Sequence, residues 1–302
     1  MIKMSSSSRQ DNTRLPELDC SFGVGLRREH YETISTAEVD FLELVTENFM
    51  SFGGKSKALA QEVSRQFPVV LHGVGLSIGS PDPLNEEYLS QLEALIELTN
   101  PRWFSDHLSY SSAFGVEYHD LIPLPFSKGA IDHVVPRIQE IQNRFSIPFL
   151  LENPSYYVTL PGSDRSEAAF FSEIVKQSEC GILLDINNVY VNATNHGYDP
   201  IKFLEEIPLE KVAQVHIAGH DSSGKFLVDT HGAAVPDEVF ALYSHLTRIA
   251  PKPFWTLLEW DHSVPSQDDL MKELEKVRQA AQFPSTFLTA SNSPKRQARE
   301  RS

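Results

Sequence analysis

Residues 147–187 contain the stretch that decides the fold: IPFLLEN (147–153), SEAAFFSEIVKQ (166–177) and GILLDIN (181–187). The first and third pieces are near-continuous apolar runs, which is the pattern of parallel strands buried on both faces. The piece between them repeats its apolar residues at helical spacing. A strand, a helix and a second strand in this order predict a parallel sheet covered by helices.

The same alternation extends over most of the chain. Eight apolar runs are present, at 22–27, 39–45, 67–73, 102–108, 147–153, 181–187, 211–217 and 253–260. Helical patterns lie between several of them, at 85–100, 130–145 (with Pro136 inside), 166–177 and near 267–282. Eight strands separated by helices predict an α/β fold of the (β/α)8 TIM-barrel type, and a doubly wound open sheet is the alternative. The helix between the first two runs is the weakest of these predictions.

The length of 302 residues suits one barrel with short extensions. Both ends of the chain are polar, with a serine-rich stretch at the beginning and a basic stretch at the end. We therefore predict a disordered tail at 1–20, a single TIM-barrel domain at 21–284, and a second disordered tail at 285–302.

The charge balance limits the classes of partner. The chain has 41 acidic and 26 basic side chains and a net charge of −15, which disfavours nucleic acid and suits divalent cations. It has two cysteines, Cys20 and Cys180, so neither a disulfide framework nor a thiolate metal cluster is expected. We see no apolar stretch long enough for a membrane span and no secretory signal, and we expect a cytoplasmic protein that binds neither nucleic acid nor membrane.

The strand ends carry an unusual set of polar residues. Active sites of TIM barrels lie at the carboxyl ends of the strands, where the side chains converge. Seven of the eight runs end in a residue that can bind a metal, and none ends in lysine; these residues are Glu43, Glu47, His72, Asp106, His107, Glu152, Asp185, His216 and Glu259. Asp229 and His231 lie in the loop after the seventh run. Imidazoles among carboxylates favour a transition metal, and their number suggests more than one ion; iron, manganese and zinc all fit.

Two other motifs are weaker. GVGLSIG (73–79) lacks the context of a dinucleotide-binding loop and is interpreted as a turn. YHDLIPLPF (118–126) is interpreted as a long loop over the barrel mouth. His30, His133, His196 and His245 have no convergent partners in the sequence pattern, and we expect them to be structural or at the surface.

Seven segments together resemble the multinuclear non-heme iron-dependent oxidases, a family that includes the methanobactin-biosynthesis oxidase. These segments are LHGVGLSIG, FSDHLSY, LLENPS, LLDINNVYVNA, VHIAGH, DTHG and LLEWD, and the similarity runs from about Gly23 to Leu270. The resemblance implies a TIM barrel of the xylose-isomerase-like type that holds two or three iron ions of mixed valence. By position, the implied metal ligands are His72, His107, Glu152, Asp185, Asn188, His216, Asp229, His231 and Glu259.

The resemblance also implies residue roles and an activity. Glu152, Asp185 and His216 would be at the centre of catalysis. Beside them or facing the substrate would be Asn153, Asn187, Tyr190 and His220; for the first three, turn and cap chemistry is an equally good explanation. Characterised relatives use dioxygen to oxidise cysteine in ribosomally made peptides, and many act with a separate protein that presents the peptide. The implied partners are therefore a Cys-containing precursor peptide and a peptide-presenting protein.

Two other functions remain open at this point. The same barrel could carry a divalent-metal sugar isomerase, epimerase or phosphodiesterase, although no lysine ends a strand and the negative charge opposes DNA binding. The chain could also be a non-catalytic metal-binding scaffold.

Overall fold

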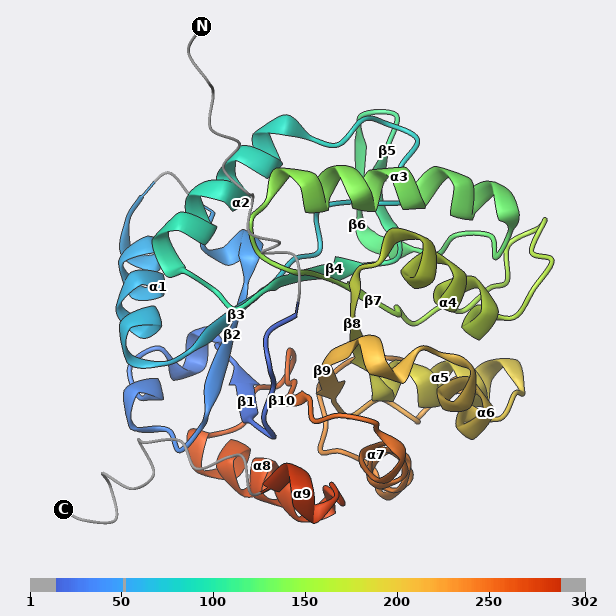
Figure 1. Ribbon diagram of the computed structural model, residues 1–302. Coiled ribbons are helices and arrows are strands. Elements are labelled where there is room, and N and C mark those ends of the chain that lie inside the picture. The colour runs from blue at the N-terminus through green and yellow to red at the C-terminus, as the bar shows by residue number, and fades with distance from the viewer. Residues whose placement is uncertain (1–14, 51–52, 289–302) are drawn as a thin grey trace, which may run out of the picture.

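A computed structural model describes residues 15–50 and 53–288 and shows a closed barrel of eight parallel strands (Figure 1). The strands are β1 (Phe22–Gly25), β2 (Phe41–Val45), β3 (Val69–His72), β4 (Phe104–His107), β7 (Phe149–Glu152), β8 (Gly181–Asp185), β9 (Val212–Ile217) and β10 (Trp255–Leu258). Because β1 pairs with both β2 and β10, the sheet has no free edge. The TIM-barrel prediction is confirmed, and the doubly wound alternative is wrong.

Helices surround the barrel, as Figure 1 shows. They are α1 (Lys55–Gln66), α2 (Glu86–Thr99), α3 (Lys128–Arg144), α4 (Glu167–Ser178), α5 (Ile186–His196), α6 (Pro200–Glu206), α7 (Asp237–Ile249), α8 (Gln267–Ala280) and the short α9 (Ser285–Leu288). Pro136 lies inside α3 and does not end it. Between β1 and β2 the chain forms only two 3-10 turns, Arg28–His30 and Ile34–Thr36, so the weakest helix prediction does not correspond to an α-helix.

The expected loop at 118–126 is partly wrong. Strands β5 (Tyr110–Ala113) and β6 (Val116–Ile122) form an antiparallel hairpin after β4. Its turn places Phe114 and Gly115 at φ of 55° and 72°, the left-handed pair that matches the twist of a hairpin. The residues of β6 are mostly exposed, so this strand lacks the apolar signal that identified the barrel strands.

The amino-terminal end of the barrel is closed by side chains. A buried cluster fills its interior and comprises Phe41, Val70, Trp103, Leu150, Leu183, Ala213, Trp255 and Leu257. Leu15 and Leu18 pack against this cluster, and the Trp255 indole N–H donates to Asp19 Oδ1 at 3.0 Å. We predicted a tail through residue 20, but packing begins by Leu15. Likewise α9 lies in the predicted carboxyl-terminal tail, while 1–14 and 289–302 lie outside the described residues.

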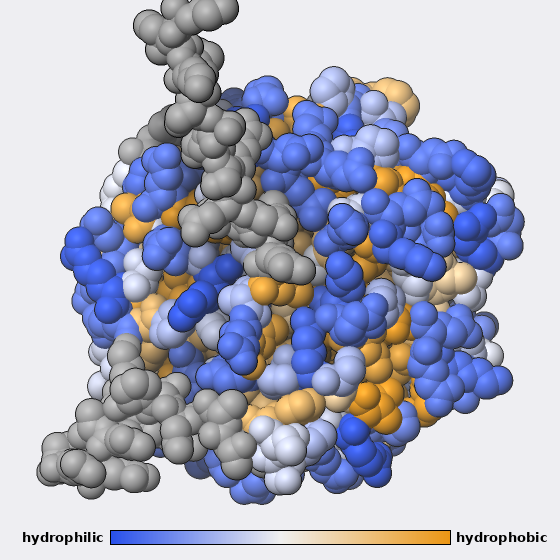
Figure 2. Space-filling view, in the orientation of Figure 1, coloured by the Kyte–Doolittle hydropathy of each residue, from blue (hydrophilic) through white to orange (hydrophobic). Residues whose placement is uncertain are grey.

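The outer surface is largely hydrophilic on the face seen in Figure 2. Hydrophobic side chains show there mainly in gaps between hydrophilic ones. Among the described residues, no helix combines the length and the apolar character needed to cross a membrane.

Candidate metal centre

The strand register brings the predicted ligands together at the carboxyl-terminal mouth of the barrel. His107 on β4 is opposite Glu152 on β7, and Asp185 on β8 is opposite His216 on β9. All four are at most 7% exposed. Since a buried charge is costly unless it is paired, such a concentration of ionisable groups requires compensation.

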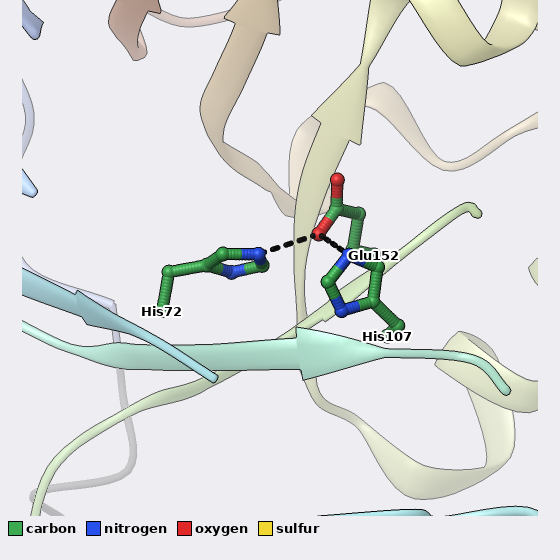
Figure 3. Close-up of side chains that lie close together, drawn as sticks. All are labelled: His72, His107 and Glu152. Carbon is green, nitrogen blue, oxygen red and sulfur yellow. Dashed lines mark ion pairs between the residues drawn. The ribbon is translucent and has the colours of Figure 1, made fainter. Parts of the chain in front are cut away.

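His72, His107 and Glu152 form the first part of the centre (Figure 3). Glu152 Oε2 lies 3.3 Å from His72 Nε2 and 3.1 Å from His107 Nε2. His107 Nδ1 lies 3.2 Å from the Gly73 carbonyl, which can only accept, so Nδ1 carries the proton. Ser105 Oγ donates to the Leu71 carbonyl and therefore accepts from His72 Nδ1 at 2.9 Å. Both Nε2 atoms thus direct a lone pair at a carboxylate oxygen, as the ligands of a cation do.

His216 forms the second part. Its Nδ1 lies 2.8 Å from Glu259 Oε2 and 3.7 Å from Glu152 Oε1, and it has no hydrogen-bond partner despite these short distances. Its Nε2 lies 2.9 Å from Glu43 Oε2 in hydrogen-bond geometry. The ring therefore again has one nitrogen held by the protein and one directed at the carboxylates.

His231 forms the third part. Its Nε2 lies 2.6 Å from Asp229 Oδ1 and 3.6 Å from Asp185 Oδ2. Its Nδ1 is hydrogen-bonded to Asp261 Oδ2 at 3.2 Å, and Asp261 is in turn held by the Arg27 guanidinium. All four histidines of the centre follow the same pattern.

Unpaired atoms test whether the site fits metal ions. Five buried polar atoms of the predicted ligands have no hydrogen-bond partner: Glu152 Oε2, Asp185 Oδ2, Asn188 Oδ1, His216 Nδ1 and His231 Nε2. A buried polar atom without a partner costs about 1–3 kcal/mol, and bound cations would satisfy these five together. The residues therefore fit a metal centre.

The candidate ligand groups share residues with one another. Four sets of three residues have ligand atoms within 4.8 Å of one another: His72–His107–Glu152, Glu43–His216–Glu259, Glu152–Asp185–His216 and Asp185–His231–Glu259. Glu152, Asp185, His216 and Glu259 each belong to two sets. A shared carboxylate can bridge two ions, and the nitrogen and oxygen donors suit iron, manganese or zinc.

Burial and neighbouring charges move the pKa values at the centre. Burial raises the pKa of Glu152 well above its ordinary range and that of Asp185 to about 7. Burial also lowers the pKa of His107 to about 4 and that of His72 well below its usual value. At neutral pH these two imidazoles are neutral, which is the form that binds a metal.

Around Glu259, His216 and His231 the pKa values shift in the opposite directions: that of the carboxyl falls and those of the imidazoles rise. Burial opposes ionisation of Glu259, but His216 and His231 hold its pKa well below the usual range. Burial also opposes protonation of these two histidines, but Glu43 and Glu259 raise the pKa of His216, and Asp229 and Glu259 raise that of His231. Without metal, protons on the imidazoles balance the carboxylates; metal ions would replace those protons.

The structure brings all nine predicted ligands to the mouth, and their ligand roles stay predictions. Asn188 Oδ1 is free while its Nδ2 donates to the Asn153 carbonyl at 3.1 Å. Asn153 exchanges two hydrogen bonds with the Asp185 backbone and so fixes the end of β8. Asn187 donates to Asp229 at 2.8 Å and contacts His220 Nδ1 at 2.8 Å, and Tyr190 stacks on His220. Of the four residues predicted beside the ligands, Asn153 and Asn187 thus contact predicted ligands directly, and His220 does so through Asn187.

Sequence reasoning missed how several residues hold the predicted ligands. Glu43, which it named only as a strand-end residue that can bind a metal, lies against His216, and Arg27 contacts both Glu259 and Asp261. Period-two alternation agrees with the inward position of Glu43, because it shares a face of β2 with Phe41 of the interior cluster. The link from Ser105 to His72 carries no comparable signal, since a serine on a buried strand is common.

Comparison with known proteins identifies the family of this chain. Residues 21–282 match the family model described as "RiPP precursor modification enzyme MbnB/TglH/ChrH", where RiPP denotes a ribosomally synthesised and post-translationally modified peptide. The chain belongs to this family. Its UPF0276 relatives include a protein of Anaeromyxobacter sp. (strain Fw109-5), 45% identical over 89% of this chain and 94% of that protein. Another, from Caulobacter vibrioides (strain NA1000 / CB15N), is 41% identical over 85% of this chain and 92% of its own length.

Solved structures with the same architecture are far more distant in sequence. D-allulose 3-epimerase from Methylomonas sp. aligns with a TM-score of 0.59 at 11% identity, over 90% of this chain and 100% of that one. Endonuclease IV from Thermus thermophilus aligns with a TM-score of 0.58 at 16% identity, over 86% of this chain and 98% of that one. At these identities the likeness shows the xylose-isomerase-like barrel fold alone. It is the family match, and not these distant structures, that supports a peptide-modifying enzyme.

Proposed function

We propose that this protein is a multinuclear iron-dependent oxidase of the cytoplasm that uses dioxygen to oxidise cysteine, or another side chain, in a ribosomally made peptide. The observation that carries the proposal is the set of five unpaired buried ligand atoms at one barrel mouth, in a chain of the peptide-modifying family. Bound iron would supply a soft, redox-active site for a substrate thiolate and for dioxygen.

The residues have distinct parts in this proposal. His72, His107 and Glu152 would hold one ion, and Asp185, His231 and Glu259 another. A third would lie between them, against His216 and the shared carboxylates. Asn188 and Asp229 complete the ligand set, and His220 with Tyr190 would border the substrate.

The rim of the mouth supports a peptide or protein partner. Every large hydrophobic side chain that is exposed in the described chain lies in a segment that follows a barrel strand, either a loop or the β5–β6 hairpin: Val74, Phe114, Val116, Tyr118, Tyr157, Val158, Phe226 and Val228. Grouped exposed apolar side chains commonly mark binding surfaces. A Cys-containing precursor peptide, alone or presented by a separate protein, would contact this apolar rim as it enters the mouth.

The test is metal analysis with Mössbauer spectroscopy of protein purified without oxygen, followed by oxygen uptake with a thiol peptide. We expect two or three irons per chain and sustained uptake. Glu152→Gln should lose iron while the barrel folds, because Glu152 serves two ligand sets; His245→Ala on α7 is the control and should keep wild-type iron. Stoichiometric zinc or manganese without iron would overturn the oxidase, and iron without oxygen uptake would indicate a scaffold.

A further inference from the structure

Glu43 is a buried carboxylate of the mouth that contacts a predicted ligand, His216, and also belongs to one of the four candidate ligand sets. It lies on β2 with no exposed surface, and its Oε2 contacts His216 Nε2 at 2.9 Å. His216 Nδ1 is the nitrogen that faces Glu152 and Glu259. Glu43 and Glu259 therefore contact different nitrogens of the His216 ring, although a carboxylate oxygen of each lies within 4.8 Å of the other.

Trp103 and Gln214 fix the position of Glu43. The Trp103 indole N–H can only donate, and it lies 2.7 Å from Gln214 Oε1. This contact sets the orientation of the Gln214 amide, so that its Nε2 donates to Glu43 Oε2 at 2.6 Å. Trp103 and Gln214 are also fully buried, which leaves this chain of hydrogen bonds without competition from water.

The geometry at His216 decides which ring nitrogen carries the proton. Nε2 makes a hydrogen bond with Glu43, whereas Nδ1 makes none with Glu259 although the atoms are only 2.8 Å apart. Gln214 Nε2 also lies 3.0 Å from His216 Nε2, but its donation to the Glu43 carboxylate is shorter and charge-assisted. The neutral ring therefore has its proton on Nε2 and its lone pair on Nδ1.

We propose that Glu43, held by Gln214 and Trp103, is a positioning residue that fixes His216 in the Nε2–H tautomer and aims Nδ1 at the metal centre. A carboxylate on the far nitrogen of a ligating histidine fixes the ring and raises its basicity, and its removal weakens metal binding by about 10- to 100-fold. This inference rests on the proposed function only in requiring that the mouth binds metal ions.

The test is an anaerobic titration of the full-length protein with Fe²⁺ alone, with ⁵⁷Fe Mössbauer spectra at saturation. Glu43→Gln should keep the wild-type number of ions but bind one of them about 10- to 100-fold more weakly. The spectrum of that ion should change while the others stay as in the wild type. Glu43→Ala should weaken it more, because glutamine still offers an acceptor oxygen to Nε2.

Glu167→Gln is the matched control. Glu167 is a buried carboxyl on α4 that is hydrogen-bonded to Tyr198 and Asn192 and contacts none of the predicted ligands. It should bind Fe²⁺ as the wild type does, and thermal unfolding of each variant will show that it is folded. Wild-type affinity in both Glu43 variants would overturn the proposal.

A second outcome would also overturn it. Glu43 Oε1 has no hydrogen-bond partner, so a direct ligand role predicts loss of one whole ion from Glu43→Gln even at saturating Fe²⁺. If the wild type binds no Fe²⁺, the iron oxidase fails, and the same titration with Zn²⁺ then tests Glu43 separately.

Discussion

At the scale of single residues, the four predicted histidine ligands are held by the same arrangement of hydrogen bonds. Each predicted histidine ligand gives one ring nitrogen to a protein acceptor and directs the other at a carboxylate; the acceptors are Ser105 Oγ, the Gly73 carbonyl, Glu43 and Asp261. Imidazoles held in this way need no rearrangement to bind a metal. Metal binding must instead displace protons. The raised pKa values of Glu152 and Asp185 keep protons on these carboxyls while no metal is bound.

Metal affinity should therefore depend on pH. The pKa of Asp185 is raised to about 7, so this group binds a proton below that pH, and a metal ion must displace it. Below about pH 7 the affinity should fall by about tenfold per pH unit for the Asp185 proton, and it should still rise above pH 7 because His216 and His231, with pKa values raised well above the usual range, also lose protons. Calorimetric Fe²⁺ titrations in buffers of different ionisation enthalpy measure this proton release. Equal affinity at about pH 6 and about pH 8 would contradict these protonation states.

At the scale of elements, the loop from β9 to α7 carries three residues of the site on a tight turn. It follows His216, contains His220, and returns through the bridge between Asp221 and Val228 to Asp229 and His231. A side chain on Gly219 would lie 2.3 Å from the Ala233 carbonyl oxygen and 2.5 Å from that of Ala234. Only glycine allows the two arms of this loop to pass so closely.

Gly219→Ala should therefore displace the arm that carries His231. The neighbours are backbone atoms, which cannot move aside as a flexible side chain does, so we expect a loss of about 1–3 kcal/mol in the free energy of unfolding. Bound metal should also decrease, because His231 and Asp229 move with the arm. Chemical unfolding and metal analysis measure both. Gly224→Ala, in the same loop with its nearest atom at 3.7 Å, is the control and should leave both unchanged; equal behaviour of the two variants would refute the argument.

The elements also show what could be predicted from sequence. All eight barrel strands were predictable, because strands buried on both faces give uninterrupted apolar runs and their last residues point into a shared mouth. Strand β6 was missed because its residues are mostly exposed, and the turn at Phe114–Gly115 is a weak signal. Glu43 was predicted only as a strand-end residue that can bind a metal, since the positioning role proposed for it depends on Gln214 and Trp103, which are far from it in sequence and meet it only inside the closed barrel.

At the scale of the whole molecule, the two ends of the barrel differ in what covers them. The amino-terminal end is closed by Leu15 and Leu18 over the interior cluster, with Asp19 bonded to Trp255. The carboxyl-terminal mouth carries the candidate metal centre and the loops with the exposed apolar side chains of the rim. Because the net charge is −15, a partner that binds at this rim is expected to rely on apolar contacts there and to avoid added negative charge.

Removal of a rim side chain should therefore weaken peptide or partner binding without affecting metal. Phe114 is 81% exposed at the tip of the β5–β6 hairpin, so Phe114→Ser removes an aromatic contact at little cost to folding. An aromatic residue central to an interface contributes about 1–3 kcal/mol, which predicts about 5- to 150-fold weaker binding. The measurement is the Kd of a Cys-containing peptide, with Fe²⁺ content determined in parallel. Lys202→Ser on the exposed side of α6 is the surface control and should bind the peptide normally.

Two outcomes would contradict this prediction. If Phe114→Ser retains wild-type affinity while Phe226→Ser loses it, the peptide enters over the β9–α7 loop instead of the hairpin. If both variants retain wild-type affinity, the apolar rim is not the binding surface.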